Sequence, residues 1–272
     1  MNKVTLFLVA TPIGNLTEAS QRVIDTLSNV EVIACEDTRN TRKLLSHFDI
    51  HTKLIAYHNF NEEKACLDII KYLDEGKDVA LVSDAGYPLL SDPGYVLVNE
   101  VIKRGYSINT VSGPNAAINA LVASGLPTNH YLFYGFLNAK SSSAKKELEE
   151  LKEFPYTIIF YEAPHRIFKT LQNVLDVFGD RRAVIGRELT KIHEEYHRGF
   201  LSELLKAEEY RGELVLIVEG FQKEEKEIDF NNLIDEVDKL VKENVKTKEA
   251  IKIIAEKYKV SKNELYDLYH KK

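Results

Sequence analysis

The sequence is poor in several residue types, and these shortages exclude several classes of protein. It has no tryptophan, a single methionine and only two cysteines, Cys35 and Cys66, which match no metal-ligand spacing. Two isolated cysteines exclude a disulfide framework and fit a reducing compartment. No apolar run approaches the ~20 residues that span a bilayer, and the N-terminus lacks the apolar stretch of a secretory signal. We therefore expect a cytoplasmic protein with no membrane partner.

Glycine motifs that bind nucleotides are also missing. No Gly-x-Gly occurs among the 13 glycines, and there is no Walker A lysine loop, so the usual dinucleotide and nucleoside triphosphate fingerprints are excluded. The net charge is −6 and the pI is about 5.8, which argues against indiscriminate binding of nucleic acid. We expect no DNA partner, whereas a local basic surface stays possible. The apolar content of 44% and the charged content of 29% are those of a globular protein.

What is present is a strand followed by a turn, a unit that occurs three times. The clearest copy is Asp78 and the apolar run 79–82, followed by Ser83-Asp84-Ala85-Gly86-Tyr87-Pro88. Weaker copies are residues 4–10, which lead into Thr11-Pro12-Ile13-Gly14, and residues 107–111, which lead into Ser112-Gly113-Pro114-Asn115. Ligands of open α/β sheets bind at the carboxyl ends of the strands, so these loops are candidates for one shared crevice. The alternative is that they are ordinary strand ends.

Strands alternate with helical segments over the first third of the chain. This pattern predicts an α/β fold with right-handed crossovers and a largely parallel sheet. Thr17 is placed to cap the first helix, which carries Val23 and Leu27 on one face. We predict an N-terminal α/β lobe over residues 1–126, a second α+β lobe over 127–222 and a C-terminal helical domain over 228–272.

The C-terminal segment has the opposite charge balance to the rest. From Val241 onward there are nine lysines and five acidic residues. Thr247 is placed to cap one helix, and the capping-box pattern Ser261-Lys262-Asn263-Glu264 opens another, which together predict a helix-turn-helix. Its positive charge favours contact with a phosphate backbone. A solvated helical appendage is the alternative, and contact with another protein is also open.

One short pattern points to different chemistry. His193-Glu194-Glu195-Tyr196-His197 has the form H-E-x-x-H, which binds zinc in metalloproteases when a helix places both histidines on one face. No third ligand is evident downstream. Surface histidines are the preferred interpretation, and no metal is expected.

Seven ordered motifs make the chain similar to a known family. They are Thr11-Pro12-Ile13-Gly14-Asn15-Leu16, Glu36-Asp37-Thr38-Arg39, Ser83-Asp84-Ala85-Gly86 with Ser91-Asp92-Pro93-Gly94, Gly113-Pro114-Asn115-Ala116-Ala117, Phe160-Tyr161-Glu162, Arg187-Glu188-Leu189-Thr190-Lys191 and Gly212-Glu213. In this order they resemble the tetrapyrrole methylase superfamily of S-adenosylmethionine enzymes. More narrowly, they resemble its bacterial branch that 2′-O-methylates a cytidine of 16S ribosomal RNA. The similarity covers essentially the whole chain.

The resemblance implies a two-lobed α/β fold that holds S-adenosylmethionine between its lobes. It also implies a homodimer acting on small-subunit ribosomal RNA or the assembled 30S subunit. Asn115 departs from the threonine that the family has at this position. Together with the turn residues noted above, the expected cofactor-binding set is Pro12, Gly14, Ser83, Asp84, Gly86, Tyr87, Gly113, Asn115, Ala116, Tyr161 and Leu189.

Transfer of a methyl group to a ribose hydroxyl requires a base to take the hydroxyl proton. Asp37 and Glu188 are the candidate carboxylates, and Lys191 is a candidate to orient one of them. Structural salt bridges are the alternative for all three. Arg39, Arg42 and Lys43 share one predicted helix face and are candidates to bind RNA phosphates, with a solvated face as the alternative.

Two other functions stay open at this point. One is a methyltransferase of the same fold that acts on a small molecule or a protein, as in tetrapyrrole or diphthamide synthesis. The other is an RNA-binding adaptor without catalytic activity.

Overall fold

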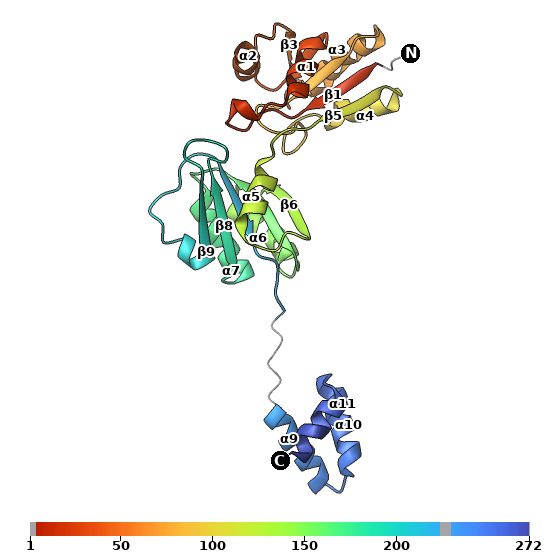
Figure 1. Ribbon diagram of the computed structural model, residues 1–272, viewed down its shortest axis with the longest axis vertical. Coiled ribbons are helices and arrows are strands. Elements are labelled where there is room, and N and C mark those ends of the chain that lie inside the picture. The colour runs from red at the N-terminus through yellow and green to blue at the C-terminus, as the bar shows by residue number, and fades with distance from the viewer. Residues whose placement is uncertain (1–3, 224–229, 272) are drawn as a thin grey trace. The chain divides into compact units, whose positions relative to one another are not determined.

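The computed structural model describes residues 4–223 and 230–271, which form two compact units, Met1–Phe221 and Gln222–Lys272. The first unit contains two five-stranded sheets, one in each of two lobes (Figure 1). The predicted start of the helical domain at residues 228–229 lies outside the described residues. No helix among the described residues is both long enough and apolar enough to cross a membrane.

The first sheet is entirely parallel, as the alternation of strands and helices predicts. Its strand order is β3-β2-β4-β1-β5. The strands are β1 (Thr5–Val9), β2 (Val32–Cys35), β3 (Lys53–Ala56), β4 (Val79–Val82) and β5 (Ser107–Val111). Because β4, β1 and β5 are neighbours, the three strand-and-turn units of the sequence end side by side at one edge of this sheet.

Helices cover both faces of this sheet, so its central strands are buried on both sides. Apolar side chains of α1 (Gln21–Asn29) and α2 (Thr38–His47) pack on one face. Those of α3 (Glu62–Asp74) and α4 (Tyr95–Lys103) pack on the other. Burial on both sides explains why β2 and β4 are continuous apolar runs rather than alternating ones.

The second sheet is mixed and has the order β6-β7-β10-β8-β9. The pair β6 and β7 is parallel, whereas the remaining pairs are antiparallel. The strands are β6 (Tyr131–Phe136), β7 (Thr157–Glu162), β8 (Arg182–Arg187), β9 (Glu195–Phe200) and β10 (Leu214–Val218).

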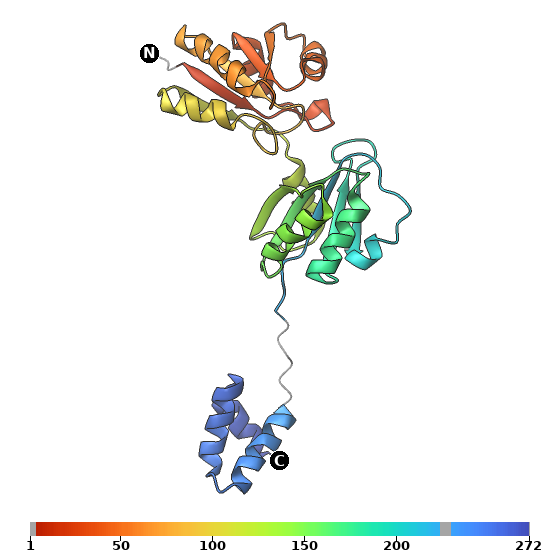
Figure 2. The ribbon, with the colours of Figure 1, turned by 180° about the vertical axis from the view of Figure 1, so that it is seen from behind.

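Helices of the second lobe also lie on both faces of their sheet. The face formed by Phe160 and its neighbours packs against α6 (Ser141–Leu151), α7 (Ile167–Phe178) and the short α8 (Leu201–Leu204); α6 and α7 lie in front of the sheet in Figure 2. The opposite face packs against α5 (Ala116–Ser124). The lobe boundary at residue 126 stays a prediction, and α5, which precedes it, packs on the second sheet.

The C-terminal unit has its own apolar core. Its helices are α9 (Phe230–Lys242), α10 (Thr247–Tyr258) and α11 (Lys262–His270), and their buried side chains include Val237, Ile251 and Leu265. Ser261 caps α11 by accepting a hydrogen bond from the Glu264 amide, which confirms this half of the predicted capping box.

Two predicted helix caps are wrong. Thr17 lies in a 3₁₀ turn (Leu16–Glu18) whose cap is Asn15, and the side chain of Ser20 caps α1 instead. Thr247 is the first residue of α10, and Lys246 occupies the capping position without a side-chain bond. The two errors differ in kind, because a later polar residue caps α1 whereas α10 begins without a side-chain cap.

A buried ion pair fixes the connection that leaves β7. The Glu162 carboxylate, with a side chain only 1% exposed, accepts from Arg166 Nε at 3.2 Å and from the Ala163 amide at 2.8 Å. The Thr170 hydroxyl also donates to it. Arg166 further donates to the Leu137 carbonyl at 2.8 Å, which connects this turn to the end of β6.

Arg166→Ala should destabilise the protein because it leaves the Glu162 carboxylate buried without its cation. We expect a loss of about 3 kcal/mol in the free energy of unfolding, measured by urea denaturation followed by circular dichroism. Lys152→Ala removes an exposed cation of the same lobe and serves as the control, with an expected change of about 0.5 kcal/mol or less. A loss below about 1 kcal/mol for Arg166→Ala would contradict the assigned role.

Candidate functional site

The loops after β1 and β4 are joined by a pair of backbone hydrogen bonds. The Thr11 amide donates to the Gly86 carbonyl at 2.9 Å, and the Gly86 amide donates to the Thr11 carbonyl at 3.0 Å. The Thr11 hydroxyl also donates to the Ser83 carbonyl at 3.2 Å. Gly86 has a φ of +74°, a conformation that glycine adopts without strain.

The loop after β5 approaches the loop after β1 equally closely. A Cβ atom at Gly113 would lie 2.9 Å from the carbonyl oxygen of Ala10, so a larger residue does not fit there. Asn115 then caps α5, since its side chain accepts a hydrogen bond from the Ile118 amide at 3.0 Å. The three loops therefore form one continuous wall.

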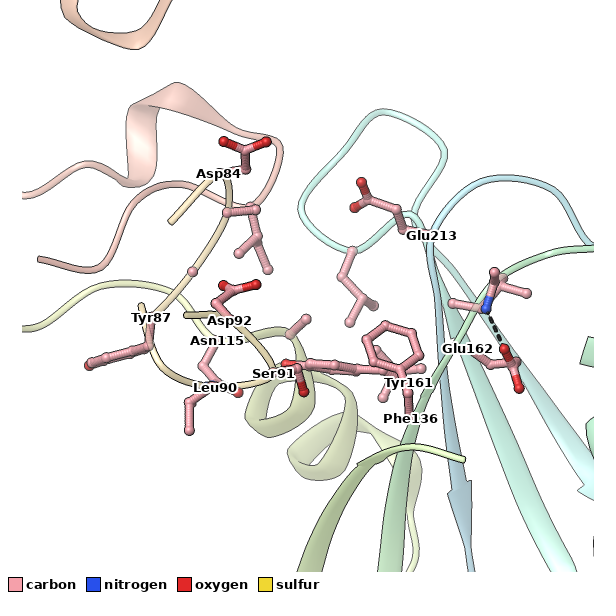
Figure 3. A pocket seen from close by; sticks show the side chains of 18 of the residues that line it. Asp84, Tyr87, Leu90, Ser91, Asp92, Asn115, Phe136, Tyr161, Glu162 and Glu213 are labelled. Carbon is pink, nitrogen blue, oxygen red and sulfur yellow. Dashed lines mark hydrogen bonds between the residues drawn. The ribbon is translucent and has the colours of Figure 1, made fainter. Parts of the chain in front are cut away.

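This wall and the second lobe enclose a cavity of about 390 Å³ (Figure 3). Pockets of about 300–1,000 Å³ accept small organic ligands. The second lobe contributes side chains at the ends of β6 and β7, the loop after β8 and the start of β10. The residues that line the cavity are Ile13, Asp84, Ala85, Gly86, Tyr87, Leu90, Ser91, Asp92, Asn115, Ala116, Phe136, Tyr161, Glu162, Ala163, Pro164, Leu189, Gly212, Glu213, Leu214 and Val215.

The structure brings most of the expected cofactor-binding residues to this cavity. Those in its wall are Asp84, Gly86, Tyr87, Asn115, Ala116, Tyr161 and Leu189. Pro12, Gly14, Ser83 and Gly113 belong to the same loops but do not line the cavity. Ser83 and Gly113 take part in the packing of these loops. A cofactor-binding role for these four residues stays a prediction.

Asp84 lines the cavity, but its carboxylate is engaged by the neighbouring loop. It accepts hydrogen bonds from the Asp37 amide at 3.3 Å and from the side-chain amide of Asn40 at 2.8 Å. Asp84 therefore ties the loop after β2 to the loop after β4.

The residues expected to be catalytic lie outside the cavity wall. Arg39 forms a bidentate pair with Asp37 and lowers the pKa of that carboxyl to about 2. Glu188 accepts from the Glu213 amide at 2.8 Å and from Lys191 Nζ at 3.0 Å, and these bonds lower its pKa. Low pKa values make both carboxylates weak bases.

Lys191 connects the two lobes rather than facing the cavity. Burial opposes its charge, but Glu188 and Glu213 outweigh this effect and raise the pKa of the ammonium group. Its side chain covers the backbone of Gly14, where an added Cβ would lie 2.5 Å from Lys191 Cγ. Gly14, with a φ of +151°, is thus required for this close approach.

Sequence reasoning did not single out Asp92, a further carboxylate that lines the cavity beside Asp84. Burial, followed by the nearby charges of Glu36 and Asp84, raises its pKa to about 6. Figure 3 shows its side chain between Asp84 and Tyr161. The available signal was the Ser91-Asp92-Pro93-Gly94 motif, but nothing in a linear sequence shows which of several acidic residues becomes desolvated.

The residues expected to bind RNA are solvent-exposed on α2. The Arg39 side chain is 85% exposed, and Arg42 and Lys43 are exposed one turn further along. The H-E-x-x-H pattern is not helical, because it runs from a turn into β9. The geometry of a zinc protease site is therefore not formed by His193 and His197.

The structure has two lobes, a parallel first sheet and a cavity formed by the strand-end loops of that sheet. The comparison with known protein families agrees with this architecture. Residues 5–205 match the model of the Tetrapyrrole (Corrin/Porphyrin) Methylases. The chain belongs to this family. The predicted two-lobed fold is thereby confirmed.

Individual relatives are similar over nearly the whole chain. The chain is 46% identical to the ribosomal RNA small subunit methyltransferase I of Halalkalibacterium halodurans, covering 99% of this chain and 96% of the relative. It is 45% identical to the protein of that name from Bacillus subtilis, covering 97% and 94%, respectively.

Solved structures show the same fold at much lower identity. A diphthine synthase superposes with a TM-score of 0.60 at 13% identity, covering 80% of this chain and 90% of that one. The uroporphyrin-III-C-methyltransferase of Thermus thermophilus superposes with a TM-score of 0.56 at 17% identity, covering 79% and 94%.

Asp92→Asn should change how stability depends on pH. Because the folded-state pKa lies above the unfolded value, the folded protein binds more protons between about pH 4 and pH 6, and its stability falls as pH rises through that window. Asparagine removes the cost of the buried charge. Above pH 6 we expect the variant to be more stable than wild type by about 1–2 kcal/mol, a figure reduced for the partial solvent access of Asp92.

Urea denaturation between pH 4 and pH 8 measures this difference. The gap between the two proteins should narrow toward pH 4, where Asp92 is protonated in the folded state and about half protonated in the unfolded state. Glu153→Gln replaces an exposed carboxylate and should follow the wild-type curve. A constant gap at every pH would show that Asp92 does not titrate in this range.

Proposed function

We propose that this protein uses S-adenosylmethionine to methylate the ribose 2′-oxygen of a cytidine in small-subunit ribosomal RNA. The observation that carries the proposal is the near-complete similarity to ribosomal RNA small subunit methyltransferases I, 44–46% identical along chains of matching length. The diphthine and uroporphyrin enzymes share only the fold, at 13% and 17% identity, so they do not support either alternative substrate.

The cavity fits S-adenosylmethionine in size and chemistry. Its volume of about 390 Å³ suits a ligand of that size, and Ile13, Tyr161 and Leu189 supply apolar walls. Asp84, Ser91, Asp92 and Asn115 supply polar groups to the cavity wall. These residues would hold the cofactor, which supplies an electrophilic methyl group when it is bound.

Methyl transfer requires the substrate hydroxyl to lose its proton, and Asp92 is the carboxylate that we propose to accept it. A base with a pKa near the working pH is the most effective, and Asp92 is close to that optimum. The catalytic role of Asp37, Glu188 and Lys191 stays a prediction. Their contacts support a different contribution, because all three hold loops that border the cavity.

The remaining parts of the proposal concern partners. Arg39, Arg42 and Lys43 are exposed near the carboxyl edge of the first sheet, where they can contact RNA phosphates. The segment from Val241 onward, with nine lysines against five acidic residues, provides a second basic element. We further propose a homodimer that works in the cytoplasm on ribosomal RNA or the 30S subunit.

The function has a direct chemical test. A 2′-O-methyl group blocks attack of the 2′-oxygen on the adjacent phosphate, so the methylated linkage resists alkali. We expect one cytidine linkage of small-subunit ribosomal RNA to be resistant in wild-type cells and hydrolysable in cells that lack the gene. Restoring the gene should restore the resistance. Methylation of the base, with a labile linkage in wild type, would refute the proposal.

Asp84→Leu should weaken the binding of S-adenosylmethionine. Leucine cannot accept the hydrogen bonds from Asn40 and the Asp37 amide, so the cavity wall at residues 84–87 loses its support. We expect a loss of about tenfold in affinity by isothermal titration calorimetry, the size of one or two such hydrogen bonds. Glu153→Leu, on an exposed surface, is the control. Unchanged affinity in Asp84→Leu would remove Asp84 from the site.

A further inference from the structure

Three large apolar side chains are the most exposed among the described residues. Phe60 is 99% exposed, Ile192 is 94% exposed and Tyr95 is 75% exposed. Phe60 precedes α3, Tyr95 is the first residue of α4, and Ile192 follows the cavity residue Leu189. The two aromatic rings thus belong to the first lobe, at the edge of its sheet where the strands end.

The loop that carries Phe60 has a defined structure. The Asn61 side chain accepts from the His58 amide at 2.8 Å and donates to the Ala56 carbonyl at 3.0 Å. The Asn61 amide donates to the His58 carbonyl at 2.9 Å. The His58 ring contacts that of Phe60 edge-on, with 6.1 Å between centroids. The loop therefore presents the phenyl ring to solvent from a fixed turn.

Hydrogen bonds to Glu62 join the start of α3 to the start of α4. Glu62, in the first turn of α3, accepts from the hydroxyl of the fully buried Tyr57 at 2.8 Å and from the Gly94 amide at 3.1 Å. Gly94 immediately precedes Tyr95. The two exposed rings therefore flank a partly buried hydrogen-bonded connection, and Asp92 of the cavity wall lies only two residues before Gly94.

The surroundings favour RNA as the occupant of this surface. Strand β3, which leads into the Phe60 loop, pairs with β2, which leads into α2 with its exposed Arg39, Arg42 and Lys43. The Glu62 carboxylate near the rings is occupied by Tyr57 and Gly94, whereas Glu63 is exposed. The rings and the cations belong to neighbouring strand-to-helix connections at the carboxyl edge of the first sheet, with α2 on one face of that sheet and α3 and α4 on the other. Exposed aromatic rings and cations along one edge are the combination that binds single-stranded RNA, through stacking on bases and contact with phosphates.

We propose that Phe60 and Tyr95 form a stacking platform for nucleobases that flank the methylated nucleotide. This inference rests on the proposed function and extends it to a specific RNA-binding surface. The platform holds the strand at the cavity rim, so that the target ribose can enter while its neighbours stay outside.

The test compares RNA affinity among exposed-residue variants, measured without cofactor by filter binding to protein-free 16S ribosomal RNA. Phe60→Ala and Tyr95→Ala should each weaken binding about tenfold, which is the usual effect of losing one stacked base. Phe60→Leu should be as weak as Phe60→Ala, because leucine is apolar but cannot stack, whereas Phe60→Tyr should bind like wild type. Ile102→Ala changes an exposed apolar residue at the other end of α4 and should have no effect.

Affinity for S-adenosylmethionine, measured by calorimetry, should be the same in every variant. Wild-type affinity of Phe60→Leu for RNA would indicate a general apolar contact and overturn stacking. Weaker binding to 30S subunits but not to naked RNA would indicate a protein contact and overturn it as well.

The inference and the proposed function can fail separately. If wild type produces the alkali-resistant linkage while Phe60→Ala and Tyr95→Ala bind RNA normally, the platform is refuted and the function stands. If wild type neither binds nor methylates the RNA, the function is refuted and the platform with it.

Discussion

The backbone pairing between Thr11 and Gly86 is the contact on which the site depends. It joins the loops after two adjacent parallel strands, and it needs no particular side chain at either position except a glycine that tolerates a positive φ. Because the two loops are hydrogen-bonded to each other, their residues line one cavity. The Asp84 carboxylate also joins the loop after β2 to these loops, through hydrogen bonds from the Asp37 amide and the Asn40 side chain. Main-chain hydrogen bonds thus position the loops whose side chains line the cavity.

Hydrogen bonding and burial shift the pKa values of the carboxylates around this cavity in opposite directions. Asp37 and Glu188 are each held by several hydrogen-bond donors, which favour the charged form and lower their pKa values. Asp92 has lost water and gained two nearby negative charges, which favour the neutral form. The first two are therefore held in ion pairs, whereas Asp92 is the carboxylate that we propose as the base. The Lys191 ammonium group is likewise held by charge pairing. It bridges two carboxylates, and its side chain covers the backbone of Gly14.

The cavity explains how a cofactor is held but not how a large substrate is positioned. A ribosomal RNA strand must be held by surfaces outside the cavity, and the edge of the first sheet offers cations on α2 and exposed rings at Phe60 and Tyr95. These features come from three consecutive strand-to-helix connections of one sheet. Parallel strand order thus brings the cavity-lining loops and the groups that we propose to bind RNA to the same edge of the sheet.

The sequence by itself determined the parallel first sheet, the three strand-end loops and the family, because apolar runs, turn residues and ordered motifs are local patterns. It also indicated Gly86, Asn115 and Tyr161, which lie in these motifs. It did not reveal β3, whose short stretch Lys53–Ala56 has no distinctive alternation, or β9, which contains the misleading H-E-x-x-H pattern. Only the tertiary structure decided that Asp92 rather than Asp37 or Glu188 faces the cavity, and that Glu62 joins α3 to Gly94. Desolvation and pairing depend on which segments meet in space, and residue spacing along the chain does not contain that information.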